Sequence, residues 1–270
     1  MSSETKKAKI ISVVNQKGGV GKTTTAINLA TTFALLKKKT LVIDLDPQGN
    51  ASTGFGIEQN QRQRTIYEVL INECDAKEAI IPTSIRNLKI ITATVDLSAC
   101  EVELLNIDQR EYILKDALKK LENDFDYIFI DCPPSLGILT INALTASNSI
   151  LIPMQCEFFA LEGLSHLLTT LDLIKDNLNK DLNISGIALT MRDRRNKLTE
   201  QVEVDVREYL QNKVFKQSIP RNVRLSEAPS HGVPGVLYDP KSPGARSYIL
   251  LAKELMKRIN KKVNVSRETN

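Results

Sequence analysis

The chain has 270 residues and a formal net charge of +4, with 42% hydrophobic and 25% charged residues. These proportions are ordinary for a soluble globular protein, and the length is sufficient for one large α/β domain. No apolar run is long enough to span a membrane, and the polar start of the chain is unlike a secretory signal. The four cysteines form no Cys-x-x-Cys pair and the two histidines have no metal-ligand spacing. We therefore expect a cytoplasmic protein with reduced thiols.

The charge is unevenly distributed along the chain. Residues 191–270 hold 17 Lys and Arg against 9 Asp and Glu, whereas residues 1–190 hold 19 against 23. A basic C-terminal third indicates a polyanionic partner such as nucleic acid. A solvated basic surface without a partner is the alternative, and charge alone does not separate the two.

One stretch organises the chain: Lys17-Gly18-Gly19-Val20-Gly21-Lys22-Thr23. Apolar residues 10–14 before it predict a strand, and residues 24–30 after it predict a helix. A strand, a glycine-rich turn and a helix that opens with Lys-Thr form the context of a phosphate-binding loop.

Each residue type in this loop suits a polyphosphate. The glycines let backbone amides point at phosphate oxygens, and the start of a helix adds its positive dipole end. Lys22 would reach the β- and γ-phosphates, and the Thr23 hydroxyl would bind Mg²⁺. The loop is a variant, because Gln16 occupies the place of the usual first glycine and a second lysine, Lys17, follows it.

Apolar runs and helical spacing alternate along the rest of the chain. We expect strands at 10–14, 40–45, 88–93, 127–130, 149–153, 183–191 and 214–219, and helices at 22–36, 65–70, 78–80, within 97–122, and at 158–178, 198–210 and 244–259, with a short polar helix after 222. The first strand, helix and second strand form a βαβ unit, so we expect an α/β fold with a predominantly parallel, twisted sheet and helices on both faces. We expect a single domain over 9–260, a short polar N-terminus at 1–8 and a frayed polar tail at 261–270.

Two predicted strands lead into aspartates. Asp44 ends one strand, and Asp46 and Gln48 follow it on a loop that Pro47 and Gly49 interrupt. Such loops lie at the carboxyl edge of a parallel sheet, where ligands bind. Asp131 ends another apolar strand, and downstream of a phosphate loop this pattern indicates a magnesium site.

Four segments, in this order, carry a family resemblance: the loop at 17–23, Asp44-Leu45-Asp46-Pro47-Gln48-Gly49-Asn50, Asp131-Cys132-Pro133-Pro134-Ser135-Leu136-Gly137, and residues 220–232. Together they resemble the deviant Walker A motif, switch segment, Walker B segment and a later stretch of the ParA/Soj ATPases, within the ParA/MinD group of P-loop ATPases. The resemblance covers about residues 8–260.

The resemblance implies a role for each matching residue. It implies that ATP and Mg²⁺ are the cofactors, that Lys17 crosses a dimer to the partner's phosphates, and that Asp46 orients the attacking water. Lys22 would assist phosphoryl transfer, and Asp44 would support the metal site. The implied nucleotide contacts are Lys17, Gly18, Gly19, Val20, Gly21, Lys22, Thr23, Thr24, Pro220, Arg221 and Asn222, and the implied metal ligands are Thr23 and Asp131 with Asp44 in support.

The resemblance also implies DNA binding. Arg195 and Arg224 match basic positions implicated in DNA binding by Soj-like proteins. The neighbouring motif usually reads Met-aromatic-Asp-x-Arg-Thr, and this chain departs from it with Arg192 and Asn196. The flanking cations Arg194 and Lys197, like Arg192, have no place in the family pattern.

The implied mechanism is a nucleotide switch. ATP would favour a homodimer that binds double-stranded DNA without sequence preference, and hydrolysis stimulated by a ParB-like protein would release it. Because a water-orienting carboxylate is the strongest base available, we expect slow hydrolysis. We expect such a protein on the nucleoid, with no membrane partner.

Three alternatives remain open at this stage. A MinD-like membrane ATPase would need a terminal amphipathic helix for lipid, and residues 250–259 are amphipathic. An iron–sulfur reductase of the nitrogenase iron-protein type would need two cysteines on Gly-rich loops, and neither Cys100 nor Cys132 has such flanks. A degenerate ATP-binding scaffold is disfavoured, because every expected catalytic position is filled.

Overall fold

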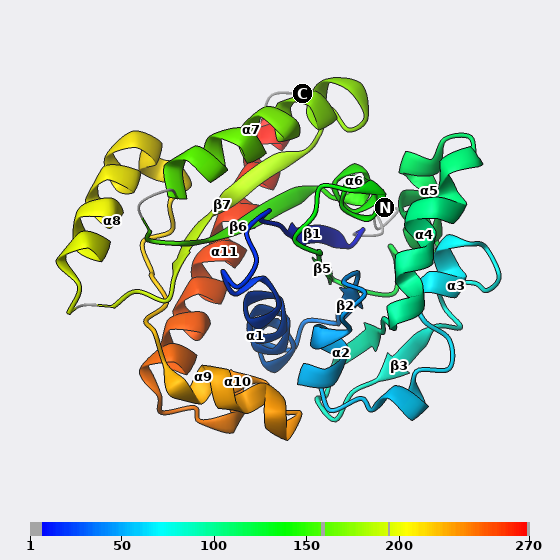
Figure 1. Cartoon of the computed structure of the whole chain (residues 1–270), viewed down its shortest axis with the longest axis horizontal. Helices are drawn as coiled ribbons and strands as arrows, with labels where there is room; N and C mark the ends of the chain where they lie inside the picture. Colours follow the sequence, from blue (N-terminus) through cyan, green and yellow to red (C-terminus); the bar gives the residue numbers. More distant parts are fainter. Residues whose placement is uncertain (1–6, 158–159, 194, 269–270) are drawn as a thin grey trace.

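A seven-stranded sheet forms the centre of the computed structural model, which describes residues 7–157, 160–193 and 195–268 (Figure 1). The strand order is β3-β4-β2-β5-β1-β6-β7. The strands are β1 (Lys9–Val13), β2 (Thr40–Asp44), β3 (Ile80–Pro82), β4 (Leu88–Ile91), β5 (Tyr127–Asp131), β6 (Ser149–Gln155) and β7 (Asn183–Thr190). Every neighbouring pair is parallel except β3 and β4, which confirms the predominantly parallel sheet.

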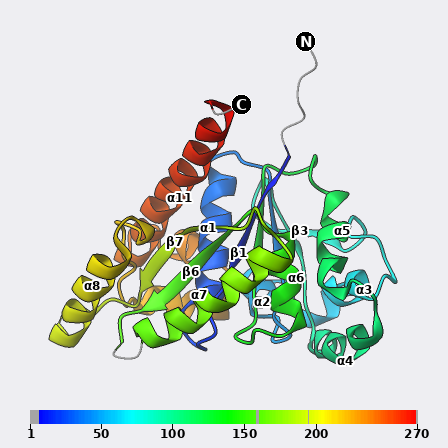
Figure 2. The same cartoon turned by 90° about the horizontal axis from the view of Figure 1, so that it is seen from above.

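Helices cover both faces of the sheet, as expected (Figures 1 and 2). One face is covered by α1 (Lys22–Leu35), α2 (Asn50–Gly54), α9 (Val223–Glu227), α10 (Gly235–Tyr238) and α11 (Pro243–Glu268). The other is covered by α3 (Ile66–Leu70), α4 (Cys100–Glu103), α5 (Ile113–Lys119), α6 (Ile138–Ala146), α7 (Ala160–Asn177) and α8 (Lys197–Leu210). Sequence patterns did not predict α6.

Burial on both faces explains the uninterrupted apolar strands. In β2, Leu41 and Ile43 belong to the core under α3–α8, while Val42 between them belongs to the core under α1 and α11. A strand buried on both faces needs apolar side chains at every position. The β2 run therefore follows from its central place in the sheet.

Two predicted elements are wrong. The expected helix at 78–80 is a turn that leads into β3, because Ile80 and Ile81 pair with β4 in an antiparallel edge strand. The expected strand at 214–219 makes only isolated contacts with β7. The Glu254 carboxylate accepts the amides of Lys216 (3.1 Å) and Gln217 (3.3 Å), and these amides are therefore not available to a neighbouring strand.

Two other predicted helical segments differ from the structure in their length. Residues 97–122 form several short helical pieces, because Gln109 has a φ of 55° and breaks the run between α4 and α5. The helix expected over 244–259 continues as α11 to Glu268, and it therefore extends into the stretch expected as a polar tail. No glycine or proline lies between 245 and 268 to stop it. Part of the predicted helix at 158–178, namely residues 158 and 159, and the ends of the two termini lie outside the described residues.

Phe33 should be a strong determinant of stability. Its buried ring packs edge-on against Tyr127 and Phe129, with centroid distances of 4.7 and 5.1 Å. Replacing Phe33 with Ala should lower the free energy of unfolding by about 3–5 kcal/mol, through lost burial and the cavity left behind. Urea unfolding would measure this change. Leu35→Ala is the matched control on the same helix, because Leu35 is 51% exposed, and a similar loss in both variants would contradict the assignment.

Candidate nucleotide-binding site

The glycine-rich loop joins β1 to α1 in the shape that a phosphate-binding loop requires. Gly19 and Gly21 have φ values of 74° and 87°, which residues with a Cβ rarely adopt. A Cβ at Gly18 or Gly19 would meet no atom within 4 Å, so open space lies in front of the loop. Among the described residues no side chain caps the start of α1, and its first amides are therefore available to an anion.

The two lysines of the loop lie in different environments. Lys22 is 7% exposed, and its ammonium donates to the Lys17 carbonyl at 3.0 Å. Burial lowers the pKa of Lys22, while the nearby Asp131 and Asp46 act in the opposite direction. The Lys17 side chain is 54% exposed and forms an ion pair with Glu157, just after β6. Lys22 therefore supports the loop from within, whereas Lys17 lies at its outer rim.

Parallel pairing brings the predicted metal-site aspartates together. Asp131 on β5 is in register with Asp44 on β2 and with Val13 on β1, directly before the loop. Both Asp131 oxygens are buried and have no hydrogen-bond partner among the residues that the structure describes. Burial, and then the charge of Asp44, raise the pKa of Asp131 well above its usual range. Thr23 acts in the opposite direction on this pKa, although its geometry falls short of a hydrogen bond.

A buried carboxylate that has no hydrogen-bond partner is available to bind Mg²⁺. Mg²⁺ is usually held by one or two protein oxygens and by substrate phosphates, not by a complete cage of side chains. The described residues contain no group of three or more His, Cys, Asp or Glu arranged to hold a metal on their own. Asp131 and Thr23 therefore fit Mg²⁺ that arrives with a nucleotide.

The switch segment places Asp44 and Asp46 differently. Asp44 Oδ2 accepts the Ser52 amide (2.8 Å) and hydroxyl (2.7 Å), and its other oxygen faces the Asp46 amide at 3.3 Å. Its hydrogen bonds thus hold the start of α2, which favours a supporting role over direct metal ligation. Asp46 is 7% exposed and accepts the Gln48 amide at 3.0 Å.

The predicted adenine segment lies beside the loop. Thr190, the last residue of β7, donates its hydroxyl to the Val20 carbonyl at 2.8 Å. Two residues later, Arg192 pairs through its backbone with Ile219 (2.9 Å) and Arg221 (3.0 Å). A pocket of about 230 Å³ adjoins these residues and is lined by Gln155, Cys156, Glu157, Met191, Asp193, Asn196, Thr199 and Arg221. Arg221 is exposed, whereas the Asn222 side chain accepts the Leu225 amide at 3.3 Å and caps α9.

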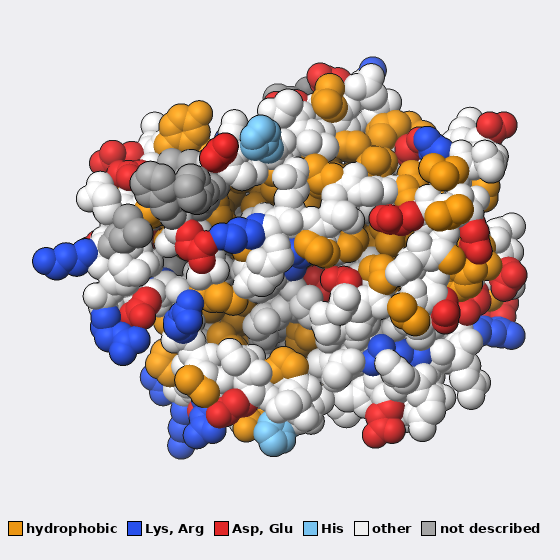
Figure 3. All heavy atoms as spheres, in the orientation of Figure 1, with side chains coloured by type: hydrophobic (Ala, Val, Ile, Leu, Met, Phe, Trp, Pro, Cys, Tyr) orange, Lys and Arg blue, Asp and Glu red, His pale blue; other side chains and the backbone are white. Residues whose placement is uncertain are grey.

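Both candidate DNA-binding arginines are already paired with carboxylates. The Arg195 side chain is 88% exposed and lies 3.0 Å from Asp193, and its hydrogen bonds lower the pKa of Asp193 to about 2. Arg224 lies 2.9 Å from Glu227 and 3.7 Å from Asp239. Figure 3 shows Lys and Arg gathered with acidic side chains on the side that carries α8 and α9. Lys197 is exposed at the start of α8, and Arg194 lies outside the described residues.

Arg192, the departure from the family motif, has a packing partner. It forms an ion pair with Glu203 on α8, which is 8% exposed and also lies 2.8 Å from Arg207. Arg207 in turn donates to the Phe215 carbonyl at 2.9 Å. An arginine at this position therefore attaches the basic loop to α8 through charge, where an aromatic residue would use apolar contact.

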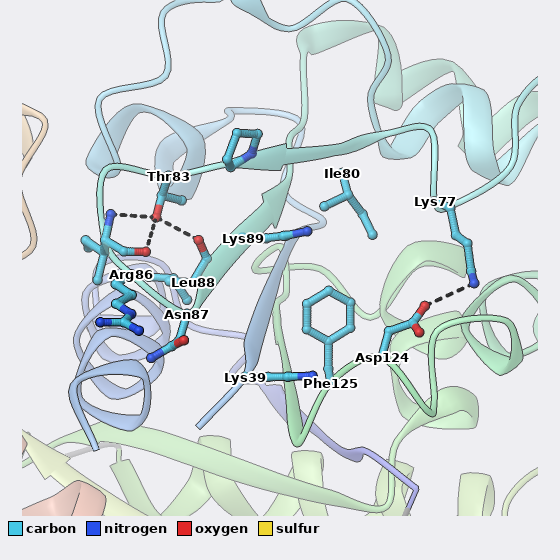
Figure 4. A pocket seen from close by; sticks show the side chains of 12 residues that line it. Lys39, Lys77, Ile80, Thr83, Arg86, Asn87, Leu88, Lys89, Asp124 and Phe125 are labelled. Carbon is cyan, nitrogen blue, oxygen red and sulfur yellow. Dashed lines mark hydrogen bonds and ion pairs between the residues drawn. The ribbon is translucent and has the colours of Figure 1, made fainter. Parts of the chain in front are cut away.

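A second pocket, of about 710 Å³, lies at the opposite edge of the sheet (Figure 4). Lys39, Lys77, Arg86 and Lys89 line it together with apolar side chains such as Ile80 and Phe125. The amino ends of β2 and β4 begin there, whereas the loop and the aspartates lie at the carboxyl ends. This pocket is therefore separate from the candidate nucleotide site.

The structure also bears on two of the alternatives, the iron–sulfur reductase and the membrane ATPase. Cys100 and Cys132 are 0% and 1% exposed, so neither thiol is presented for an iron–sulfur cluster at a subunit surface. In α11, the apolar face with Tyr248, Leu251 and Leu255 is buried in the core, which leaves that face unavailable for lipid. No helix in the described part of the chain is long and apolar enough to cross a membrane.

The fold and the loop define a P-loop nucleotide-binding protein, and comparison with known proteins specifies the family. A family model described as an AAA domain matches residues 8–184. The chain is 56% identical over 250 residues to the chromosome partitioning protein ParA of Myxococcus xanthus, covering 93% of this chain and 88% of that protein. It is 53% identical over 247 residues to the sporulation initiation inhibitor protein Soj of Bacillus subtilis, covering 92% and 98%.

A solved structure supports the fold. The cobyrinic acid a,c-diamide synthase of Mycobacterium smegmatis, crystallised with ADP and magnesium, has a TM-score of 0.83 and 34% identity, covering 94% of this chain and 96% of that one. Because the chain is 56% and 53% identical to the ParA and Soj proteins over nearly its whole length, it belongs to the ParA/Soj family of P-loop ATPases.

Asp131 gives the site a stability signature that can be measured. Because its folded pKa is raised, Asp131 favours folding at pH values below its unfolded pKa of about 4 and opposes it as the pH rises through the folded pKa. Asp131→Asn should therefore raise the Tm of the nucleotide-free protein at pH 7 and remove the further rise caused by Mg-ATP. For a domain of this size about 1 kcal/mol shifts the Tm by roughly 2–4 °C.

The control for this experiment is Asp176→Asn, which changes an exposed carboxylate on α7. Thermal unfolding of both variants, with and without Mg-ATP, would be followed at pH 7 and near pH 4. The gain of Asp131→Asn should shrink at the lower pH. A lower Tm at pH 7 without nucleotide would contradict the assignment of Asp131 as an uncompensated buried carboxylate.

Proposed function

We propose that this protein is a ParA-type ATPase in DNA segregation, which uses ATP to form a DNA-binding homodimer. One observation carries the proposal: the two loop lysines are separated, with Lys22 buried under the loop and Lys17 half-exposed at its rim. A buried lysine can serve the phosphates of its own subunit, and an outer lysine can reach those of a second subunit. The relatives named as partitioning proteins support the same role.

In the proposed site, the backbone of residues 18–23 and Lys22 bind the phosphates, and Pro220 to Asn222 lie beside the base. Thr23 and Asp131 would hold Mg²⁺, with Asp44 in support, and the ion supplies charge neutralisation for the phosphates. Asp46 orients the attacking water. A single carboxylate in this role supports slow intrinsic hydrolysis, as suits a switch.

Dimerisation would connect the nucleotide to DNA. Each Lys17 would leave Glu157 for the partner's phosphates, and the two basic surfaces with Arg195 and Arg224 would then act together. Two weak sites on one particle bind more tightly by effective concentration. Contacts of this kind follow the phosphate backbone without reading sequence. Hydrolysis, stimulated by a ParB-like protein, would remove the γ-phosphate that joins the subunits and would thereby release DNA. The protein would act in the cytoplasm, on the nucleoid.

The proposal predicts how DNA binding depends on nucleotide. Binding to an arbitrary duplex should appear with ATP, be at least about tenfold weaker without nucleotide or with ADP, and be lost with ATP in Lys17→Ala, since a lost tethered site forfeits its effective concentration. Fluorescence anisotropy at fixed salt would measure it. Equal binding in all four states would exclude the switch. Binding to anionic vesicles in place of DNA would favour the MinD-like alternative.

Arg195 and its carboxylate partner should act in opposite directions on DNA. Arg195→Ala should weaken binding of all sequences about equally and reduce the slope of log K against log salt by about one unit. Asp193→Asn should strengthen binding, because it frees the Arg195 guanidinium for phosphate. Titrations at several salt concentrations would separate the effects. Arg86→Ala, at the opposite edge of the sheet, is the control; an equal loss there would indicate diffuse electrostatic attraction.

A further inference from the structure

Arg62 is a buried arginine behind the switch segment, and no part of the proposed mechanism uses it. It follows the short 3₁₀ turn Gln59–Gln61 and is 8% exposed. Its guanidinium donates to the Ala93 carbonyl (3.0 Å), to the Thr53 hydroxyl (2.8 Å) and to the Ile57 carbonyl (2.7 and 3.1 Å). One side chain therefore joins the end of α2, the loop after it and the end of β4.

The Arg62 guanidinium also lies directly under the segment that carries Asp46. Gly49 has a φ of 62°, and a Cβ there would lie 2.4 Å from Arg62 Nη1 and 2.9 Å from the Ala93 carbonyl oxygen. The Gly49 amide closes a turn on the Asp46 carbonyl at 2.9 Å. The position of the Asp46 turn is thus limited by the arginine beneath Gly49.

Hydrogen bonds connect Arg62 to the backbone of the Asp46 turn and to the Asp44 carboxylate. On one route, Arg62 holds Thr53, whose hydroxyl (3.1 Å) and amide (3.0 Å) donate to the Gly49 carbonyl at the end of the Asp46 turn. On the other route, Arg62 holds Ala93, whose amide donates to the Ser52 hydroxyl at 3.2 Å. The Ser52 hydroxyl in turn donates to Asp44 at 2.7 Å.

We propose that Arg62 is a positioning residue for ATP hydrolysis, which holds the switch segment so that Asp46 can orient the attacking water. This inference rests on the proposed hydrolytic function. Arginine suits the role because its planar fork reaches three acceptors at fixed angles, and lysine offers a single point charge. Arg62 does not belong to the phosphate loop, so nucleotide affinity does not depend on it.

Steady-state hydrolysis by the full chain tests the inference. Arg62→Met should lower kcat at least about tenfold, because small displacements of a positioning group have effects of this size, and should leave the KM for ATP within about twofold. Arg62→Lys should fall between Arg62→Met and the unchanged protein. Arg64→Met is the matched control, since Arg64 lies two residues away, is exposed and forms an ion pair with the exposed Glu78. It should hydrolyse ATP like the unchanged protein.

A merely structural role would give a different result. It would reduce the number of nucleotide-binding sites per chain, measured with a fluorescent ADP analogue, in proportion to the lost activity. Unchanged kcat in folded Arg62→Met, or parallel loss of binding sites and activity, would overturn the inference.

Amide hydrogen exchange keeps Arg62 testable even if the proposed function fails. In Arg62→Met the amides of Gly49 and Thr53 should exchange faster, while those of Gly19 and Gly21 in the phosphate loop should not change. If the unchanged protein hydrolyses no ATP, the proposed function is wrong, yet unaltered exchange at Gly49 and Thr53 would separately refute the contact argument for Arg62.

Discussion

The candidate site depends on the cost of burying charge. Asp44, Asp46, Asp131 and Lys22 meet where the central strands end, and an ionised group removed from water is unfavourable unless it is hydrogen-bonded or paired. Ser52 compensates Asp44, a turn amide compensates Asp46 and a loop carbonyl accepts from Lys22. Only Asp131 has no hydrogen bond within the described part of the chain. A cation that arrives with a nucleotide would supply what Asp131 lacks and would stabilise the folded state by its binding free energy.

The hydrophobic core fixes the relative positions of Asp44 and Asp131. Asp44 and Asp131 are opposite each other because β2 and β5 pair in one register. A shift of one residue would turn each side chain to the other face, and would move Leu41 and Val42 between two different cores. Because both faces of β2 are buried, such a shift costs much apolar burial. The packing of helices on the two faces thus fixes the strand register that places Asp44 opposite Asp131.

Local patterns predict the parts of this protein that depend on local chemistry. The loop at 17–23 needs glycine at positive φ and a following helix, and both are visible in the sequence. Asp44 meets Asp131 because β2 and β5 pair in parallel, and these strands are neighbours in the sheet although they are not consecutive in the sequence. By contrast, the irregular course of 214–219 depends on Glu254, about forty residues away, and the role of Arg62 depends on Ala93 across the sheet edge. Contacts between distant residues leave no periodic signal, so they could not be predicted from spacing.

The paired arginines explain why a single subunit would be a weak DNA ligand under the proposed function. A phosphate that binds Arg195 or Arg224 replaces a carboxylate already in contact with it, so each contact exchanges one exposed ion pair for another. Exposed pairs contribute at most about 1 kcal/mol, and the net gain of such an exchange is smaller than that of a free cation meeting phosphate. The affinity for DNA then depends on how many arginines exchange a carboxylate for a phosphate at the same time. The free energies of these exchanges add, while the entropy of association is lost only once. Joining two subunits doubles the number of exchanges, and the carboxylates therefore make DNA binding more dependent on the dimer than unpaired arginines would.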